Sequence, residues 1–195
     1  MSGWTEGEYS LVREARDSER GFLEDLDQSC FRQRAPIILV CCSDWKRRHD
    51  IIQHTAALRG YRPDEDPETH ALNWHGGVIR LAPNSPTNLI PKTDEMFLQE
   101  VVNALRWTKF RDLVMYAHWP CKQATVAGLT VEEVWQASMS GRDRVVERMS
   151  GSVTARTFFH ADYENLQAGK RSYYLHPRRC VSWLTQARDD TSHPR

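Results

Sequence analysis

The 195-residue sequence contains no long apolar run and no excess of charge of either sign. No segment approaches the roughly 20 apolar residues that a membrane-spanning helix requires, so we expect no membrane partner. Lysine plus arginine and aspartate plus glutamate both number 26, which gives a formal net charge of zero. Binding to nucleic acid requires a basic excess on the protein surface, and so we expect no nucleic-acid partner either.

The sequence also lacks a recognisable targeting segment, internal repeats and low-complexity regions. Residues 1–8 have neither the basic nor the apolar part of a secretory signal peptide, which predicts a cytoplasmic protein. Cysteine occurs five times, and an odd number in a cytoplasmic chain argues against a disulfide framework. These cysteines are therefore expected to bind metal or to lie buried as free thiols.

Apolar runs alternate along the chain with amphipathic helical patterns. The run 36–40 is continuously apolar, which predicts a strand buried on both faces, and 77–81 and 112–117 predict two more strands. We expect helices at 46–58, at 93–110 with Thr93 as its cap, and at 130–149 behind a capping box. The alternation predicts an α/β fold with a mainly parallel central β-sheet flanked by helices.

The remaining segments complete a single predicted domain, 1–195. Leu11, Ala15, Phe22 and Leu26 lie near helical spacing, which predicts an N-terminal helical arm over 1–32. The α/β core would then cover 33–188. Its later parts are an exposed loop at 61–73, strands at 153–159 and 172–175, and a short helix at 178–187. Residues 189–195 form a polar tail.

The first segment that carries chemistry is Cys42-Ser43-Asp44, directly after the first predicted strand. Side chains alternate along an extended chain, so Cys42 and Asp44 point to one side and Cys41 to the other. Cys42 is therefore the candidate ligand, and Cys41 is expected to be a core thiol. Asp44 also suits the cap of the helix that follows.

The second such segment is His118-Trp119-Pro120-Cys121, after the strand at 112–117. Sites in open α/β sheets collect beyond the carboxyl ends of strands, so the two segments are expected to meet. Pro120 suits the first position of a helix, which would place Cys121 near a helix N-terminus, where thiolate is favoured.

Two thiolates, an imidazole and a carboxylate predict a Zn²⁺ site. Cys42, His118 and Cys121 are the candidate ligands, and they leave one tetrahedral position. Asp44 either fills that position and closes the site, or stands beside the metal and accepts a hydrogen bond from bound water. Three protein ligands with an exchangeable fourth group are typical of catalytic zinc, whose bound water has a pKa of about 7.

The Cys-Ser-Asp strand end followed by the later His-x-x-Cys turn resembles the motifs of the β-class carbonic anhydrases. The resemblance covers 36–149. It implies zinc held by Cys42, His118 and Cys121, and hydration of carbon dioxide to bicarbonate by zinc-bound hydroxide. It also implies that Asp44 orients the bound water or ligates zinc in a resting form. The protein would be a homodimer or a higher homo-oligomer, with the N-terminal helical arm wrapped around the partner.

The sequence departs from the family pattern Cys-x-Asp-x-Arg, in which the arginine pairs with the aspartate and holds it off the metal. Lys46 stands at the arginine position, and a lysine lacks the bidentate fork of an arginine. Arg47 lies one residue further along and would need a different backbone path, so Lys46 or Arg47 is expected to neutralise Asp44. Lys122 also replaces a glycine of the pattern, and we attribute the long spacing between the motifs to an insertion at 61–73.

We therefore expect a zinc-dependent, carbonic anhydrase-like lyase whose small-molecule substrate is carbon dioxide or bicarbonate. Two alternatives stay open. The same site could hydrolyse a related molecule such as carbonyl sulfide or carbon disulfide. If Asp44 closes the site permanently, the protein is a non-catalytic, zinc-stabilised interaction or regulatory module. We interpret His160-Ala161-Asp162, which resembles a small metal motif, as a chance pairing.

Overall fold

A six-stranded β-sheet forms the centre of the molecule, in the strand order β1-β6-β5-β4-β2-β3. The computed structural model describes residues 4–17, 19–163 and 169–191. The strands are β1 (Leu23–Asp25), β2 (Ile37–Cys41), β3 (Thr69–Asn73), β4 (Asp112–Trp119), β5 (Thr154–Asp162) and β6 (Lys170–Leu175). Strands β3, β2, β4 and β5 pair in parallel, whereas β6 and β1 are antiparallel to their neighbours. The predicted α/β fold with a mainly parallel sheet is confirmed.

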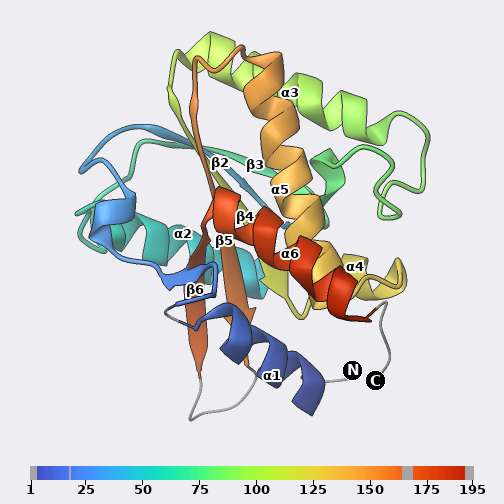
Figure 1. Cartoon of the computed structure of the whole chain (residues 1–195). Coiled ribbons are helices and arrows are strands. Elements are labelled where there is room, and N and C mark those ends of the chain that lie inside the picture. Colours follow the sequence, from blue (N-terminus) through green and yellow to red (C-terminus); the bar gives the residue numbers. More distant parts are fainter. Residues whose placement is uncertain (1–3, 18, 164–168, 192–195) are drawn as a thin grey trace.

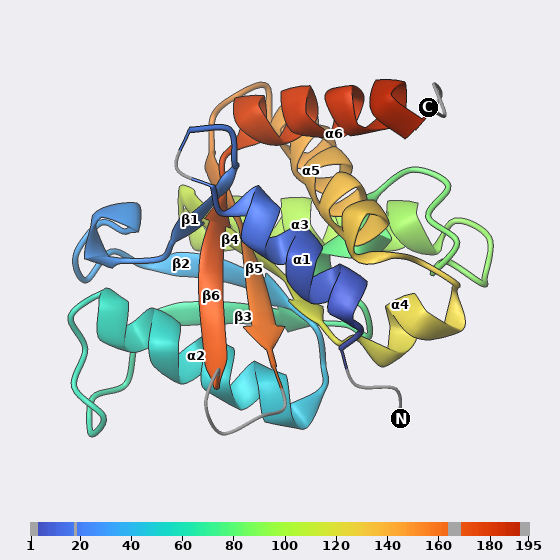
Figure 2. The same cartoon turned by 60° about the horizontal axis from the view of Figure 1, so that its bottom comes forward.

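Helices cover both faces of this sheet (Figures 1 and 2). The α-helices are α1 (Glu6–Ala15), α2 (Trp45–Leu58), α3 (Thr93–Thr108), α4 (Lys122–Val126), α5 (Val131–Arg148) and α6 (Pro177–Thr191). Two short 3₁₀ helices, η1 (Gln28–Cys30) and η2 (Gly77–Leu81), complete the described elements. Helix α2 packs on one face, and α3, α5 and α6 lie on the other. Consecutive residues of β2 therefore alternate between two apolar cores.

The segment 77–81 is a 3₁₀ helix, so the prediction of a strand there is wrong. Gly76 and Gly77 both have positive φ, at 91° and 56°, which an extended strand does not allow. A Cβ on Gly77 would lie 2.8 Å from the backbone nitrogen of Cys42. This close approach lets η2 pack under the ends of β2 and β4, where its apolar residues are buried.

The segment 61–73 is not an exposed loop throughout, because Thr69–Asn73 forms β3. This strand lies at the edge of the sheet and pairs in parallel with β2. Most of its residues are only half-buried. An edge strand of this kind tolerates polar side chains, which is why its sequence does not show an apolar run.

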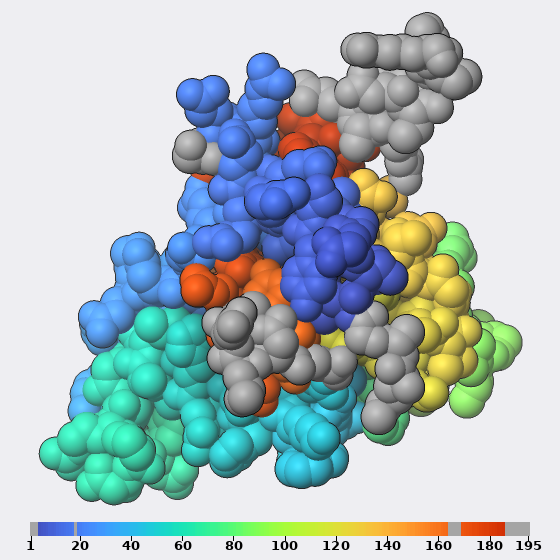
Figure 3. All heavy atoms as spheres, turned by 90° about the horizontal axis from the view of Figure 1, so that it is seen from below, coloured from blue at the N-terminus to red at the C-terminus, as the bar shows by residue number. Residues whose placement is uncertain are grey.

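The helical stripe predicted near the N-terminus ends earlier than expected. Helix α1 stops at Ala15, and Phe22 and Leu26 flank the short strand β1 instead of extending the helix. Trp4 donates from Nε1 to the carbonyl oxygen of Asp162 at 2.7 Å, and Tyr9 stacks on Tyr163. Helix α1 therefore lies against the end of β5 and beside α4 in its own chain (Figures 2 and 3). The wrapping of this segment around a second subunit stays a prediction.

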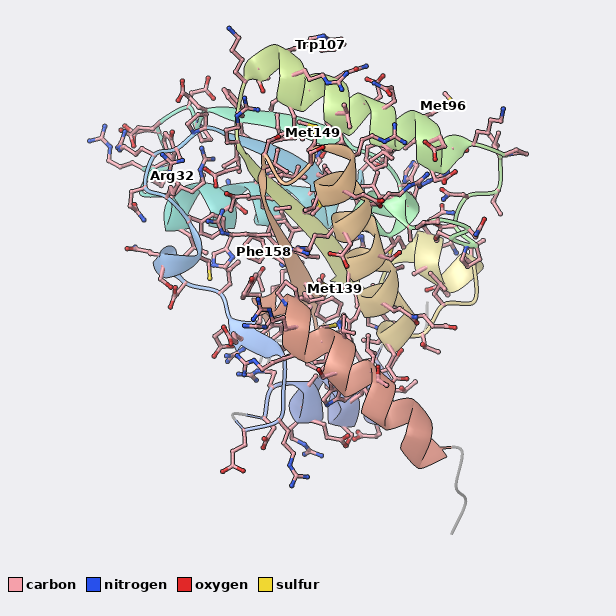
Figure 4. The ribbon with its side chains drawn as sticks, turned by 45° about the horizontal axis from the view of Figure 1, so that its top comes forward. Arg32, Met96, Trp107, Met139, Met149 and Phe158 are labelled. Atoms are coloured by element: carbon pink, nitrogen blue, oxygen red, sulfur yellow. The ribbon has the colours of Figure 1, made fainter. Side chains whose placement is uncertain are left out.

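Two helix boundaries and the exposure of one side chain also differ from the sequence-based expectation. Thr93 is the first residue of α3 and its hydroxyl donates to the carbonyl of Ile90, so it is not the cap. Met96, expected on the apolar face of α3, is 61% exposed and points outward (Figure 4). Helix α6 extends to Thr191 and so includes the start of the predicted polar tail, while 192–195 lie outside the described residues.

None of the described helices combines the length and apolar character needed to span a bilayer.

Candidate metal centre

The two motifs meet at the carboxyl ends of β2 and β4. Cys42 directly follows β2, and His118 is the penultimate residue of β4, which pairs with β2 in parallel. Cys121 is the N-cap residue of α4, reached through a cis peptide bond between Trp119 and Pro120. Pro120 thus precedes the cap and does not occupy the first helical position. The prediction that the two segments meet at the carboxyl ends of the strands is confirmed.

Cys42, His118 and Cys121 are all buried, and their candidate ligand atoms lie within 4.8 Å of one another. Ligands at about 2.0–2.3 Å from one zinc ion are separated by roughly 3.5–3.8 Å in a tetrahedron. The cluster is therefore compact enough to bind one ion after small side-chain adjustments. These residues could hold a metal, and their sulfur and nitrogen donors are those that Zn²⁺ prefers.

The hydrogen bond that His118 makes through Nδ1 leaves its Nε2 available to a metal. Nδ1 lies 2.9 Å from the carbonyl oxygen of Pro120, which can only accept, so Nδ1 carries the proton. In the neutral ring Nε2 is then the nitrogen without a proton, and it is buried without a hydrogen-bond partner in the described structure. A buried lone pair without a donor is costly, and a metal ion would satisfy it. The residues present therefore fit zinc.

Cys42 is the thiol that ionises first. A hydrogen bond from the Cys121 thiol holds the pKa of Cys42 below its usual value, against the opposing effect of burial. The backbone N–H of Gly76 also donates to Cys42 Sγ at 3.3 Å. The same hydrogen bond and burial raise the pKa of Cys121, which keeps the shared proton. Cys42 is thus the easier of the two cysteines to ionise, and Cys121 must release its proton when a metal binds.

Cys41 points away from this cluster, as the alternation predicts. Its side chain belongs to the core on the α2 face, where Sγ contacts Asn73 Oδ1 at 2.9 Å. Burial raises the pKa of Cys41 to about 12, so it stays a neutral thiol. The assignment of Cys42 and not Cys41 to the candidate site is consistent with this geometry.

Asp44 lies beside the cluster and caps α2. Its Oδ1 accepts from the backbone N–H of Lys46 at 3.1 Å, and its Oδ2 accepts from Arg47 at 3.1 Å. Burial alone would raise the pKa of Asp44, but the charge of Arg47 and the hydrogen bonds from the Lys46 backbone N–H and from Arg47 outweigh burial and lower it. Among the described residues, the group whose donor atoms are close enough to share an ion consists of two cysteines and a histidine, without Asp44.

The side chain that pairs with the Asp44 carboxylate is that of Arg47 and not that of Lys46. Lys46 is exposed, and its ammonium lies over the Trp45 ring, 5.7 Å from the ring centroid. Arg47 is the third residue of α2, and a side chain at that position reaches back to the N-cap, as in a capping box. This i, i+3 relation explains how an arginine displaced by one residue still reaches Asp44.

Two residues of β5 complete the surroundings of the site, although the sequence had indicated only a chance pairing. Asp162 Oδ2 lies 3.1 Å from Arg47 Nε. His160 is the parallel-strand partner of His118; its Nδ1 contacts Ser172 Oγ at 3.0 Å, and burial lowers its pKa to about 4. The spacing of two between His160 and Asp162 at a strand end was the available signal, because it places both side chains on one face.

Comparisons with known proteins give little beyond this geometry. No protein-family model matches the sequence, and no curated protein matches it. Among solved structures, the chain is similar to the β-carbonic anhydrase CafD of the filamentous fungus Aspergillus fumigatus, in its wild-type form and in two mutant forms. Each match has 15% sequence identity and a TM-score of 0.45, and covers 78% of this chain and 98% of that chain. A similarity this distant does not assign the chain to a family or an activity.

Proposed function

We propose that the protein is a zinc-dependent lyase that interconverts carbon dioxide and bicarbonate. The observation that carries the proposal is the buried cluster of Cys42, His118 and Cys121, in which His118 Nε2 has no hydrogen-bond partner in the described structure. The two motifs that build this cluster resemble those of the β-class carbonic anhydrases. In this proposal Cys42, His118 and Cys121 hold the ion.

Zinc held by these residues would supply a Lewis acid that lowers the pKa of a coordinated water to about 7. The two thiolates would balance the charge of the ion, and the Nδ1–H of His118 would stay fixed on the carbonyl of Pro120. This hydrogen bond orients the ring, so Nε2 faces the cysteines throughout the reaction.

Asp44 is proposed to orient the nucleophile. Its lowered pKa keeps the carboxylate ionised at neutral pH, and an ionised carboxylate only accepts hydrogen bonds. Asp44 would therefore accept a hydrogen bond from the attacking water and so fix its orientation. Arg47 neutralises Asp44 and holds its Oδ2, which favours a site with an exchangeable position over the closed, purely structural alternative.

The test of the proposal is stopped-flow hydration of carbon dioxide by zinc-loaded protein from about pH 7 to pH 9, where metal-bound water ionises. We expect a rate well above buffer that disappears on Cys121→Ser. A rate equal to buffer, with zinc bound at one ion per chain, would reject this activity. Parallel assays with carbonyl sulfide and carbon disulfide decide between the related substrates.

Arg47→Ala and Lys46→Ala form a matched pair for the same assay. Because Arg47 contacts Asp44 and the Lys46 side chain is exposed, we expect Arg47→Ala to reduce kcat by about 10–100-fold. Lys46→Ala, which keeps its backbone N–H on Asp44, should retain most of the rate. Equal losses in the two variants would contradict the assignment of Arg47 as the functional partner.

We further propose that the protein is a homodimer, on the basis of the motif resemblance. Light scattering coupled to gel filtration measures the mass directly, and a monomeric mass of about 23 kDa at all concentrations would exclude the dimer. The cytoplasmic location stays a prediction.

A further inference from the structure

The guanidinium of Arg47 lies between two carboxylates from different elements. On one side its NH1 contacts Asp44 Oδ2 at 3.1 Å, and on the other its Nε contacts Asp162 Oδ2 at 3.1 Å. The three side chains are only 13%, 26% and 11% exposed for Arg47, Asp44 and Asp162. Arg47 and Asp44 belong to the start of α2, whereas Asp162 ends β5.

The contact with Asp44 alone is not enough to fix the arginine. An ion pair within one helix turn contributes little by itself, because the long arginine side chain loses conformational freedom when it pairs. A second carboxylate on the other side of the guanidinium restricts the arginine to one arrangement. Arginine suits this role because its planar fork can contact two acceptors at once.

Asp162 is itself held firmly. It is the last residue of β5, its backbone pairs with Lys170 of β6, and its carbonyl oxygen accepts from Trp4 Nε1 at 2.7 Å. Strand β5 also pairs with β4, which carries His118. The position of Asp162 relative to the metal cluster is therefore set by the sheet and not by the first turn of a helix.

We propose that Asp162 is a positioning residue that locks Arg47, so that Arg47 in turn keeps Asp44 away from the metal. The inference rests on the proposed zinc site and deepens it. Without Asp162, Arg47 swings away from Asp44, and the freed carboxylate binds the metal as a fourth protein ligand. The site then closes and loses its exchangeable position. Asp162 compensates for the one-residue displacement of the arginine in this sequence.

The test uses full-length protein loaded with Co²⁺, whose visible absorption reports the number and type of ligands, and thiocyanate as the probe anion. In the unmodified protein, thiocyanate should enter the exchangeable position and change the spectrum. In Asp162→Asn, we expect the spectrum of a closed site and thiocyanate binding at least about tenfold weaker. The readout is a ligand-binding spectrum and does not depend on turnover.

The sign of this effect separates positioning from simple electrostatics. Removing the negative charge of Asp162 makes the site more positive, and by Coulomb attraction alone an anion would bind more tightly. Weaker thiocyanate binding is therefore expected only if another group, Asp44, takes the position. The double variant Asp44→Asn, Asp162→Asn removes that competing ligand, and it should bind thiocyanate at least as tightly as the unmodified protein.

Asp112→Asn is the matched control. Asp112 is another buried carboxylate paired with arginines, Arg32 and Arg156, but it begins β4 at the opposite end of the sheet. Its loss should lower stability without changing the Co²⁺ spectrum or thiocyanate affinity. Asp162→Glu, which keeps the charge, should restore much of the thiocyanate binding. If Asp162→Asn does not fold, Asp162→Ser removes the same charge with a smaller side chain.

The outcomes distinguish the two proposals. If the unmodified Co²⁺ protein shows no response to thiocyanate, the site has no exchangeable position, and both the lyase and the role of Asp162 are rejected. If the unmodified protein responds and Asp162→Asn binds thiocyanate as tightly or more tightly, the lyase proposal stands and the role of Asp162 is overturned. Failure of the double variant to regain binding would also overturn it.

Discussion

Cys41 and Cys42 are adjacent in the chain and have the same side chain, but their surroundings give them opposite chemistry. Cys41 is a neutral thiol in an apolar core, and Cys42 shares a proton with Cys121 beside an imidazole. The difference arises from the alternation of side chains at the end of β2. The chemical behaviour of a cysteine at this strand end therefore depends on which face of the sheet its side chain reaches.

This contrast gives a prediction about metal content. Cys42→Ser should lose bound zinc because a serine hydroxyl is a far poorer zinc ligand than a thiolate. Cys41→Ser, the neighbouring substitution, should keep one zinc per chain, since its hydroxyl can also donate to Asn73. Elemental analysis of both purified variants measures the zinc. Zinc retained in Cys42→Ser, or lost equally from both variants, would contradict the predicted ligand set.

The arginine partner of Asp44 shows how far the residue pattern could be read from sequence. The Cys-x-Asp-x-Arg pattern places the basic partner of Asp44 at Lys46. The capping relation between an N-cap and the third helical residue indicates Arg47 instead. Both residues were named as candidates from sequence. The contact itself needed the first turn of α2 to be in place.

At the scale of elements, the η2 segment packs closely against the backbone of Cys42, one of the three candidate metal ligands. Gly77 has φ of 56°, and its missing Cβ leaves room for the backbone of Cys42 and for the carbonyl oxygen of Tyr116. The preceding Gly76 donates its N–H to Cys42 Sγ. Two consecutive glycines thus allow a buried 3₁₀ helix to support the ends of β2 and β4.

Gly77→Ala should therefore be strongly destabilising. The new Cβ would meet backbone atoms at 2.8–2.9 Å in addition to the cost of a positive φ. Gly128→Ala is the control, because Gly128 has φ of 72° but a Cβ added there would meet no atom within 4 Å. We expect urea unfolding to show a loss about 2 kcal/mol larger for Gly77→Ala than for Gly128→Ala. Equal losses would show that the close approach at Gly77 is unimportant.

Sequence patterns predicted elements well where one periodicity dominated. The buried strands β2 and β4 and the capped helix α5 follow from continuous apolarity and a capping box. The predictions at β3 and η2 were wrong because an edge strand tolerates polar residues, and because a short apolar run has no period that separates a strand from a buried turn of helix.

At the scale of the whole molecule, the candidate site joins strand ends that are far apart in the sequence. Cys42 follows β2, and His118 and Cys121 belong to β4 and the turn after it. A metal bound by all three residues binds the folded state and not the unfolded chain. Metal binding should therefore be linked to global stability.

The expected result is a zinc-dependent thermal transition. At free zinc about 100 times its Kd, linkage contributes about 2.7 kcal/mol, and for a chain of this size each kcal/mol shifts Tm by about 2–4 °C. Chelation should lower Tm by a corresponding amount in calorimetry. His118→Asn, which removes one ligand, should show a much smaller shift. A Tm that is the same with and without chelator would contradict metal binding by the folded chain.

The sequence by itself determined the fold class, the two strand-end motifs and the division between Cys41 and Cys42, because these depend on local periodicity and on the alternation of side chains. Only the tertiary structure decided that Arg47 pairs with Asp44, that Gly76 donates to Cys42, and that Asp162 lies against Arg47. These contacts join a helix, a turn and a strand from distant parts of the chain. Their distances depend on sheet pairing and core packing, which no local pattern encodes.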